Sequence, residues 1–206
     1  MPAKNTVKEY DERQYYHVYN RGVEKRDIFL DNQDYVVFLG LLKKYLTGEN
    51  LEKSNNRHKF KHLGDDVKLL SYCLMPNHFH LLLYQESEKG ISQFMRKLAT
   101  GYVMYFNNRY DRVGGLFQGR YKASLIASDP YLYHISRYIH LNPKNYVDYP
   151  YSSLRYYERP ESSPVWLTTE NILDLFDNSP EQYRSFVEDY VLSDDEIRGI
   201  EKITAN

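Results

Sequence analysis

Two histidines stand one residue apart at the start of an apolar segment, MPNHFHLLLY, at residues 75–84. In a β-strand, alternate residues point to the same side, so His78 and His80 would project together while Phe79 points into the core. Two neutral imidazoles roughly 6–7 Å apart along a strand can bind one cation between them. Ordinary surface or core histidines are the simpler interpretation of such a triplet. The rest of the sequence has to decide between the two.

A divalent ion held by two histidines needs a third ligand from another segment. Residues 129–142, DPYLYHISRYIHLN, have the apolar spacing of a helix, with Asp129 as the expected N-cap and Pro143 as the expected stop. Tyr138 and Asn142 are four residues apart and would therefore share one face of this helix. Asn142 offers an amide oxygen to a hard cation. Tyr138 offers a phenolate, which can form covalent intermediates.

Two imidazoles, an amide oxygen and a phenol predict a centre for phosphoryl transfer. The cation would polarise the scissile phosphate, and Tyr138 would attack the phosphorus. The product would be a phosphotyrosine link at one end and a free hydroxyl at the other. Such a link conserves the ester bond, which favours strand transfer over hydrolysis. The alternative is that Tyr138 is one of 22 ordinary tyrosines. His140 points about 200° away on a 3.6-residue helix, so we predict a structural or DNA-facing role for it.

Several cationic side chains in the neighbouring segments could bind phosphates. Arg120 and Lys122, in FQGRYK, would share one face of an expected strand. Arg96 and Lys97 lie on an expected helix, and Arg21 ends the first expected strand. We predict that these five residues contact DNA. Solvated surface charges are the alternative.

The charges divide the chain into a basic and an acidic part. Residues 1–146 carry 22 Lys and Arg against 15 Asp and Glu, whereas residues 147–206 carry 5 against 13. A basic body fits a polyanionic partner, although an ordinary protein with an acidic helical end would show the same pattern. The single cysteine, Cys73, excludes an internal disulfide and a C-x-x-C metal site. No apolar stretch is long enough to span a membrane. We expect a cytoplasmic, nucleoid-associated protein.

The order of the expected elements predicts the architecture. We expect strands at 15–21, 67–75, 78–84 and 114–126 (the last as one strand or a strand pair), and helices at 31–46 and 91–110. The order strand, helix, strand, strand, helix, strand predicts an α+β, ferredoxin-like βαββαβ antiparallel sheet with helices on one face. The other face would be left for a ligand or partner. His58 and His62, four apart in a polar segment, are expected to lie in a loop without a metal.

Four segments come in an order similar to that of the HUH-type single-tyrosine transposases. They are YHVYNRG (16–22), MPNHFHLLL (75–83), FQGRYKA (117–123) and RYIHLNP (137–143). The chain resembles most the REP-associated tyrosine transposases, a branch similar to insertion-sequence transposases, over about residues 15–155. The resemblance implies a ferredoxin-like fold, a homodimer, and Mg²⁺ or Mn²⁺ as cofactor. It also implies binding to hairpin DNA and cleavage of single strands beside the hairpin through a 5′-phosphotyrosine intermediate.

The same resemblance implies a role for individual residues. His78 and His80 match the histidine pair, Tyr138 matches the nucleophile, and Asn142 occupies a position that can supply a further polar ligand. We therefore expect an N-terminal tail at 1–14, an HUH transposase/endonuclease domain at 15–146, and a linker with an acidic helical extension at 147–206. The extension is acidic, whereas some members have basic tails, which argues against a DNA contact there.

Three functions remain open at this point. The first is a metal-dependent DNA transposase and single-strand endonuclease. The second is a relative that holds hairpin DNA or RNA without cutting it. The third is a ferredoxin-like dimer with a structural role, which would have no affinity for a hairpin oligonucleotide.

Overall fold

The computed structural model describes residues 10–48 and 62–189. Its sheet contains β1 (Gln14–Arg21), β2 (Val67–Met75), β3 (His78–Gln85) and β4 (Lys122–Ile126) in the order β2-β3-β1-β4. All three neighbouring pairs are antiparallel. Helix α1 (Asn32–Thr47) connects β1 to β2, and α2 (Gly90–Arg109) connects β3 to β4. This is the predicted ferredoxin-like arrangement.

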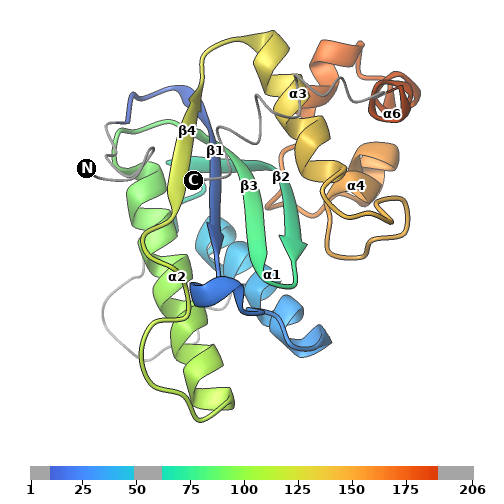
Figure 1. The fold of residues 1–206 in the computed structure, drawn as a ribbon. Helices are drawn as coiled ribbons and strands as arrows, with labels where there is room; N and C mark the ends of the chain where they lie inside the picture. Colours follow the sequence, from blue (N-terminus) through green and yellow to red (C-terminus); the bar gives the residue numbers. More distant parts are fainter. Residues whose placement is uncertain (1–9, 49–61, 190–206) are drawn as a thin grey trace.

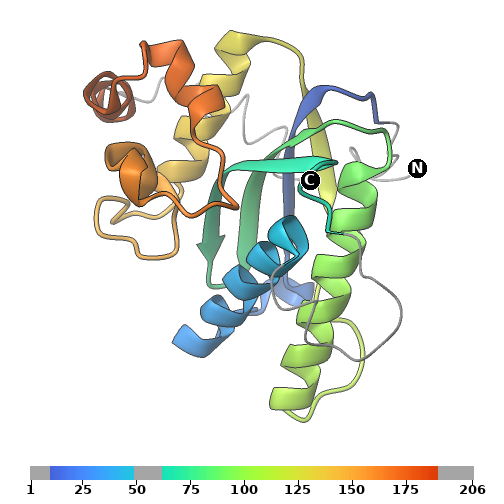
Figure 2. The same cartoon turned by 180° about the vertical axis from the view of Figure 1, so that it is seen from behind.

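The two helices of the βαββαβ unit lie together on one side of the sheet. Figure 1 looks onto the sheet with α1 behind it, and Figure 2, from the opposite side, shows α1 and α2 in front. The remaining helical elements follow β4 in the chain, apart from a single 3₁₀ turn after β1. They are η1 (Val23–Lys25), α3 (Asp129–His140), α4 (Leu154–Glu158), η2 (Pro160–Ser162), α5 (Glu170–Leu173), η3 (Asp174–Phe176) and α6 (Pro180–Glu188). No helix in the described part of the chain is long and apolar enough to cross a membrane.

Strand β3 sends alternate side chains to opposite faces of the sheet. Phe79 is buried in the core beneath α1 and α2, so His78 and His80 point to the other face. Pairing with β1 places Tyr19 opposite His80 and Arg21 opposite His78. Because a shift of one residue would exchange the two faces, this register determines where the imidazoles stand.

That second face is partly covered, which corrects the prediction of an open face. Helix α3 buries Leu132, Ile135 and Ile139 against a second core that includes Cys73 and Leu82 of the sheet. The sequence pattern predicted the helix that follows β4, but not that its apolar stripe packs across this face of the sheet. The part of this face around His78 and His80 is hollow.

Strand β4 is shorter than predicted, because residues 114–121 form bends and irregular backbone rather than a strand. Gly114 has a φ of 93°, which takes the backbone out of the extended region. One isolated bridge, between Phe117 and Gly22, connects this segment to the end of β1. Arg120 therefore lies in a loop, whereas Lys122 is the first residue of β4.

Helix α3 also has different ends from those predicted. Ser128, not Asp129, is the N-cap residue, so that Asp129 is already the first residue of the helix. The helix ends at His140, and Asn142 lies two residues beyond it. The residue before a proline avoids the α region, so we expected Pro143 to end the helix at Asn142. The helix ends two residues earlier. Asn142 is therefore not on a helical face with Tyr138.

The chain beyond α3 lies along the outer edge of β2. The N–H of Leu74 donates to the carbonyl of Tyr151 at 3.0 Å, and the N–H of Ser153 donates to Tyr72 at 3.0 Å. These bonds cover an edge that would otherwise offer unpaired backbone groups to another chain. The proposed boundary between a body and an extension at residue 147 stays a prediction. His58 and residues 1–9 of the expected tail lie outside the described residues.

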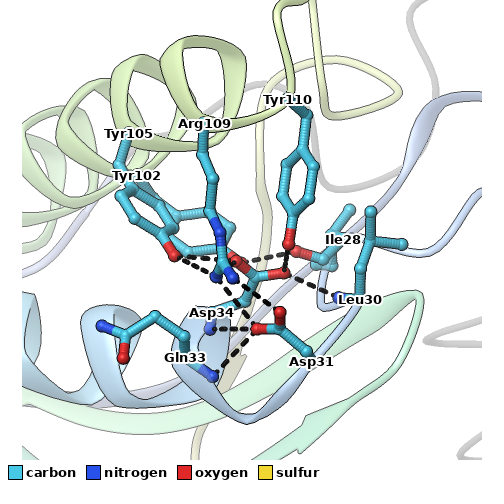
Figure 3. A network of polar contacts seen from close by, with 9 residues as sticks. All are labelled: Ile28, Leu30, Asp31, Gln33, Asp34, Tyr102, Tyr105, Arg109 and Tyr110. Atoms are coloured by element: carbon cyan, nitrogen blue, oxygen red, sulfur yellow. Dashed lines mark hydrogen bonds and ion pairs between the residues drawn. The ribbon is translucent and has the colours of Figure 1, made fainter.

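A buried carboxylate connects α1 to the end of α2 (Figure 3). Asp34 is fully buried and accepts four hydrogen bonds. The donors are the backbone N–H of Leu30 at 2.7 Å, the hydroxyls of Tyr105 at 2.9 Å and Tyr110 at 2.8 Å, and the guanidinium of Arg109 at 2.9 Å. Since every lone pair of the carboxylate has a partner, the charge is tolerated inside the protein.

This network supports the turn that precedes His78. The hydroxyl of Tyr102 donates to the carbonyl of Ile28. The N–H groups of Ile28 and Phe29 in turn donate to the carbonyl of Pro76 at 2.7 Å and 3.0 Å. The loop held by Asp34 therefore holds the hairpin turn, and the turn determines where β3 begins.

His140 is structural, because it is fully buried between the C-terminal segment and the sheet. Its Nδ1 lies 2.7 Å from the hydroxyl of Tyr183, and its Nε2 lies 2.7 Å from Oγ of Ser153. The DNA-facing alternative is wrong, since no part of the side chain reaches the surface. Burial lowers the pKa of the His140 imidazole to about 3.

Replacing Asp34 should destabilise the fold because it removes the buried carboxylate on which four hydrogen-bond donors, including the Arg109 guanidinium, converge. We expect Asp34→Asn to lower the free energy of unfolding by about 3 kcal/mol, because the amide presents a donor where donors already converge. Asp31→Asn is the matched control: Asp31 caps α1 and pairs with Arg109 at the surface, and asparagine caps helices equally well. Urea denaturation measures both. Equal effects in the two variants would contradict the role of Asp34.

The buried neutral His140 should make the fold sensitive to acid. In the unfolded chain the pKa of His140 is near 6.5. Between about pH 6.5 and 3, the unfolded state therefore binds a proton at His140 that the folded state does not bind. Stability is therefore retained above pH 6.5 and falls as the pH drops below it. From pH 7 to pH 5, wild type should be destabilised by about 2 kcal/mol more than His140→Gln. Identical changes in urea titrations at the two pH values would show that His140 does not contribute.

Candidate active site

A cavity of about 520 Å³ opens on the α3 side of the sheet, where β1 ends and β3 begins. Three of the predicted catalytic residues line it: His78, His80 and Tyr138. His78 and His80 come from alternate positions of β3, and their ring centroids are 5.1 Å apart with the planes at 88°. The structure thus brings together groups that lie about 60 residues apart in the sequence.

Tyr138 reaches the histidines of its own chain. Its ring centroid lies 5.5 Å from that of His80, edge to face at 84°. The orientation follows from the helix, because the buried stripe of Leu132, Ile135 and Ile139 turns the adjacent face of α3 toward the cavity. A phenol and an imidazole pair therefore face the same space, from a helix and a strand.

Asn142 joins the site from just beyond α3. Its Oδ1 lies 3.0 Å from Nε2 of His78, while Nδ1 of the same ring lies 2.6 Å from Oδ1 of Asn77. Because a neutral imidazole has a single N–H, His78 can donate a hydrogen bond to only one of these two amide oxygens, and its other nitrogen keeps a lone pair. The contact places Asn142 beside the histidine pair, with the amide arriving from a loop rather than a helix, and the shared role of these residues as ligands stays a prediction.

The donor atoms fit a small hard cation. Adjacent ligands of an octahedral ion with bonds of about 2.1 Å are roughly 3 Å apart, close to the separation of Nε2 of His78 and Oδ1 of Asn142. In the described residues, no group of three or more His, Cys, Asp or Glu side chains could hold a metal. A site here would use His78, His80 and Asn142, with water or substrate in the other positions. Mg²⁺ commonly keeps such open positions.

Burial keeps both histidines in the form that binds a cation. Burial lowers the pKa of His80 well below its ordinary value, and the neighbouring rings of His17 and His78 lower it further. Burial also lowers the pKa of His78, although the contact with Asn142 opposes this. Both imidazoles are therefore neutral at pH 7, with a lone pair available for a metal.

The cavity wall is positively charged. Arg21, Arg120 and Lys122, all predicted to contact DNA, line it together with Lys25, which the sequence analysis did not identify. No Asp or Glu is found among the described residues of this wall. Burial and the nearby Arg21 lower the pKa of Lys122, as expected where cations crowd together. An anionic ligand such as a phosphate would relieve that crowding.

The other two predicted DNA contacts lie elsewhere. Arg96 and Lys97 are on α2, which packs on the opposite face of the sheet from Tyr138. Spacing along a helix identifies neighbours on that helix, but it does not say which face of the sheet the helix covers. A strand bound in the cavity would have to pass around the sheet to reach them.

Two aromatic side chains of β1 were not predicted as site residues. His17 and Tyr19 project to the same face as His80, and Tyr19 lines the cavity. The alternation in YHVYNR places both on the face of Arg21. That signal becomes informative only when the register of β1 against β3 is known, which the sequence pattern alone does not establish.

A family model described as "Transposase IS200 like" matches residues 35–142, which include all of His78, His80, Tyr138 and Asn142. This chain belongs to the IS200-like transposase family. Membership supports a DNA-processing enzyme in general terms. No curated protein matches the chain.

One solved structure, described first, shares the fold of this family member. A REP-associated tyrosine transposase, solved bound to a REP hairpin, is 15% identical with a TM-score of 0.57 and covers 79% of this chain and 89% of its own. A candidate transposase from Deinococcus radiodurans is 16% identical with a TM-score of 0.41, over 65% of this chain and 94% of its own. The first of these supports the ferredoxin-like fold across most of the described residues.

The position of the cations predicts which of them contact DNA. We expect Arg120→Ala with Lys122→Ala to weaken binding of single-stranded DNA and to lower the slope of log affinity against log salt by about 1.4, roughly 0.7 for each phosphate that is no longer neutralised. Arg96→Ala with Lys97→Ala removes the same charge from the opposite face and is the control. Fluorescence anisotropy at several salt concentrations measures both. A larger effect in the control pair would show that DNA lies along α2 instead.

Proposed function

We propose that this chain is a metal-dependent DNA transposase and single-strand endonuclease that acts through a 5′-phosphotyrosine intermediate. The observation that carries the proposal is the position of Tyr138, whose ring faces the neutral His80 in a basic cavity. Family membership supports the general reaction class. The phenol, the imidazole pair and the cations together fit an attack on a phosphodiester.

Each residue has a separate role in this reaction. Arg21, Arg120 and Lys122 would hold the phosphates of the strand beside the cavity. The oxygen of Tyr138 would bond to the phosphorus as the bond to the 3′ oxygen breaks, the phenol losing its proton and the 3′ oxygen ending as a hydroxyl. The 5′ end would then be joined to the protein. Attack by a 3′ hydroxyl on this link would rejoin strands and release the tyrosine.

Mg²⁺ or Mn²⁺, held by His78, His80 and Asn142, would polarise the phosphate and offset the charge that develops on the departing oxygen. The imidazoles and the amide are neutral, so the full charge of the ion would be available to the phosphate. Asn77 would hold the ring of His78 from the other side through the contact at its Nδ1.

The proposed substrate is single-stranded DNA next to a hairpin. The solved REP-associated tyrosine transposase holds a REP hairpin, and its fold resembles this chain over most of its length. We infer that this chain also takes a palindromic hairpin, with the cut strand in the basic cavity. Such a substrate would place the protein in the cytoplasm, at the nucleoid.

One chain supplies every group that this mechanism uses. Tyr138, His78, His80 and Asn142 meet without a second subunit. A homodimer stays a prediction, and we propose that it is not needed to assemble the centre. The edge of β2, which could pair with another chain, is covered by the residues that follow α3.

Tyr138→Phe should abolish a covalent adduct without weakening DNA binding, because only the attacking oxygen is removed. The measurement is a denaturing gel of labelled hairpin DNA with a single-stranded flank, incubated with Mn²⁺. Tyr131→Phe, on the same helix, is the matched control and should still form the adduct. If wild type binds the hairpin tightly but never forms an adduct, the chain is a non-cleaving DNA- or RNA-binding relative. An adduct in Tyr138→Phe would mean that another residue is the nucleophile.

A further inference from the structure

A third histidine lies beside the proposed ligands without facing the cavity. His17 is on β1, two residues before Tyr19, and Tyr19 is the residue paired with His80. The side chain of His17 is fully buried, so it cannot touch a substrate. Any part that His17 plays in the reaction must therefore act through a neighbour.

That neighbour is His80. Nε2 of His17 lies 2.8 Å from Nδ1 of His80, and the two rings stack with centroids 5.0 Å apart at 21°. Nδ1 of His80 is thus occupied, which leaves Nε2 as the nitrogen available to a cation. A neutral imidazole has one N–H and one lone pair. His80 can offer the lone pair of Nε2 only if its proton is on Nδ1, where His17 would accept it.

His17 is itself held in place on several sides. Tyr19 stacks on its ring with centroids 5.0 Å apart at 28°, and the ring of Tyr138 approaches edge to face at 6.0 Å. A neutral imidazole at this position keeps one lone pair, which Nε2 of His17 can offer to an N–H at Nδ1 of His80.

The Nδ1 atom of His17 makes an imidazole at this position unfavourable for the stability of the fold. Nδ1 is buried and has no hydrogen-bond partner among the described residues. A buried polar atom without a partner is destabilising, and an apolar side chain of similar size would avoid it. The imidazole is not explained by packing alone, whereas its Nε2 has a specific partner in the candidate site.

We propose that His17 is a positioning residue that orients His80 and holds its proton on Nδ1, so that Nε2 of His80 faces a divalent cation. The proposal rests on the cation site proposed above. In metal sites, groups that hydrogen-bond to the ligands fix their orientation and tautomer, and their removal weakens metal binding about 10–100-fold.

The test is Mn²⁺ affinity, measured by electron paramagnetic resonance on the full chain without DNA. His17→Leu fills the space but cannot accept a hydrogen bond, and we expect it to weaken Mn²⁺ binding about 10-fold or more. His17→Gln retains an acceptor and should restore affinity to within about threefold of wild type. Leu98→Ala, in the core on the opposite face, is the control for general destabilisation and should bind Mn²⁺ normally.

Each result has a distinct meaning. If His17→Leu binds Mn²⁺ as wild type does, or if Leu98→Ala weakens binding as much, the role of His17 is refuted while the cation site stands. If wild type itself binds no Mn²⁺, the proposed cation site fails and His17 loses its role with it.

A second measurement does not depend on a variant that folds. Nitrogen-15 spectra of the wild-type histidines with saturating Mg²⁺ report which nitrogen of His80 carries the proton. We expect the proton on Nδ1, with a coupling across the hydrogen bond to Nε2 of His17. A proton on Nε2 of His80 under these conditions would overturn the proposal.

Discussion

The alternation of β3 is the constraint on which the candidate site depends. It sends Phe79 into the core under α1 and α2, and it leaves His78 and His80 side by side on the opposite face. Burial of the Phe79 face fixes the register of β3 in the sheet, because a one-residue shift would put two imidazoles into an apolar core. The loop held by Asp34 reinforces the same register by binding the turn at Pro76.

The second requirement is a helix that returns across that face with a tyrosine toward the histidines. Helix α3 is fixed to the sheet by its apolar stripe, and it is fixed from behind by His140, which bonds to Ser153 and Tyr183. Arg137 also donates to the carbonyl of Phe186 at 3.0 Å. The C-terminal helices, whose acidity made a DNA contact unexpected, thus have a clear structural role: they hold the helix that carries Tyr138.

Residue spacing in the sequence predicted the structural features that depend on neighbouring residues along the chain. Period-two and period-3.6 spacing identified the elements of the ferredoxin-like sheet, and the same spacing placed His78 with His80. The start of α1 is equally local, since the Asp31 side chain that caps it accepts only from the next few residues. The ligand set of His78, His80 and Asn142 stays a prediction, whereas the expected helical position of Asn142 was wrong.

Long-range packing determined what the sequence could not predict. His17 meets His80 only because β1 pairs with β3 in one particular register. Arg96 and Lys97 were separated from the cavity because α2 covers the opposite face, and no spacing along α2 contains that information. Lys25 comes from a turn with two left-handed residues, Glu24 with φ of 57° and Lys25 itself with φ of 60°, and no sequence motif identifies this turn.

The central claim is that one cation would sit between the paired histidines and within reach of Tyr138 of the same chain. Anomalous diffraction from crystals of the wild-type protein grown with Mn²⁺ tests it most directly. We predict a single strong peak bonded to Nε2 of His78, Nε2 of His80 and Oδ1 of Asn142, on the side of the rings that faces the phenol. Full-occupancy Mn²⁺ bound elsewhere, with His78 and His80 still bonded only to protein groups, would contradict it.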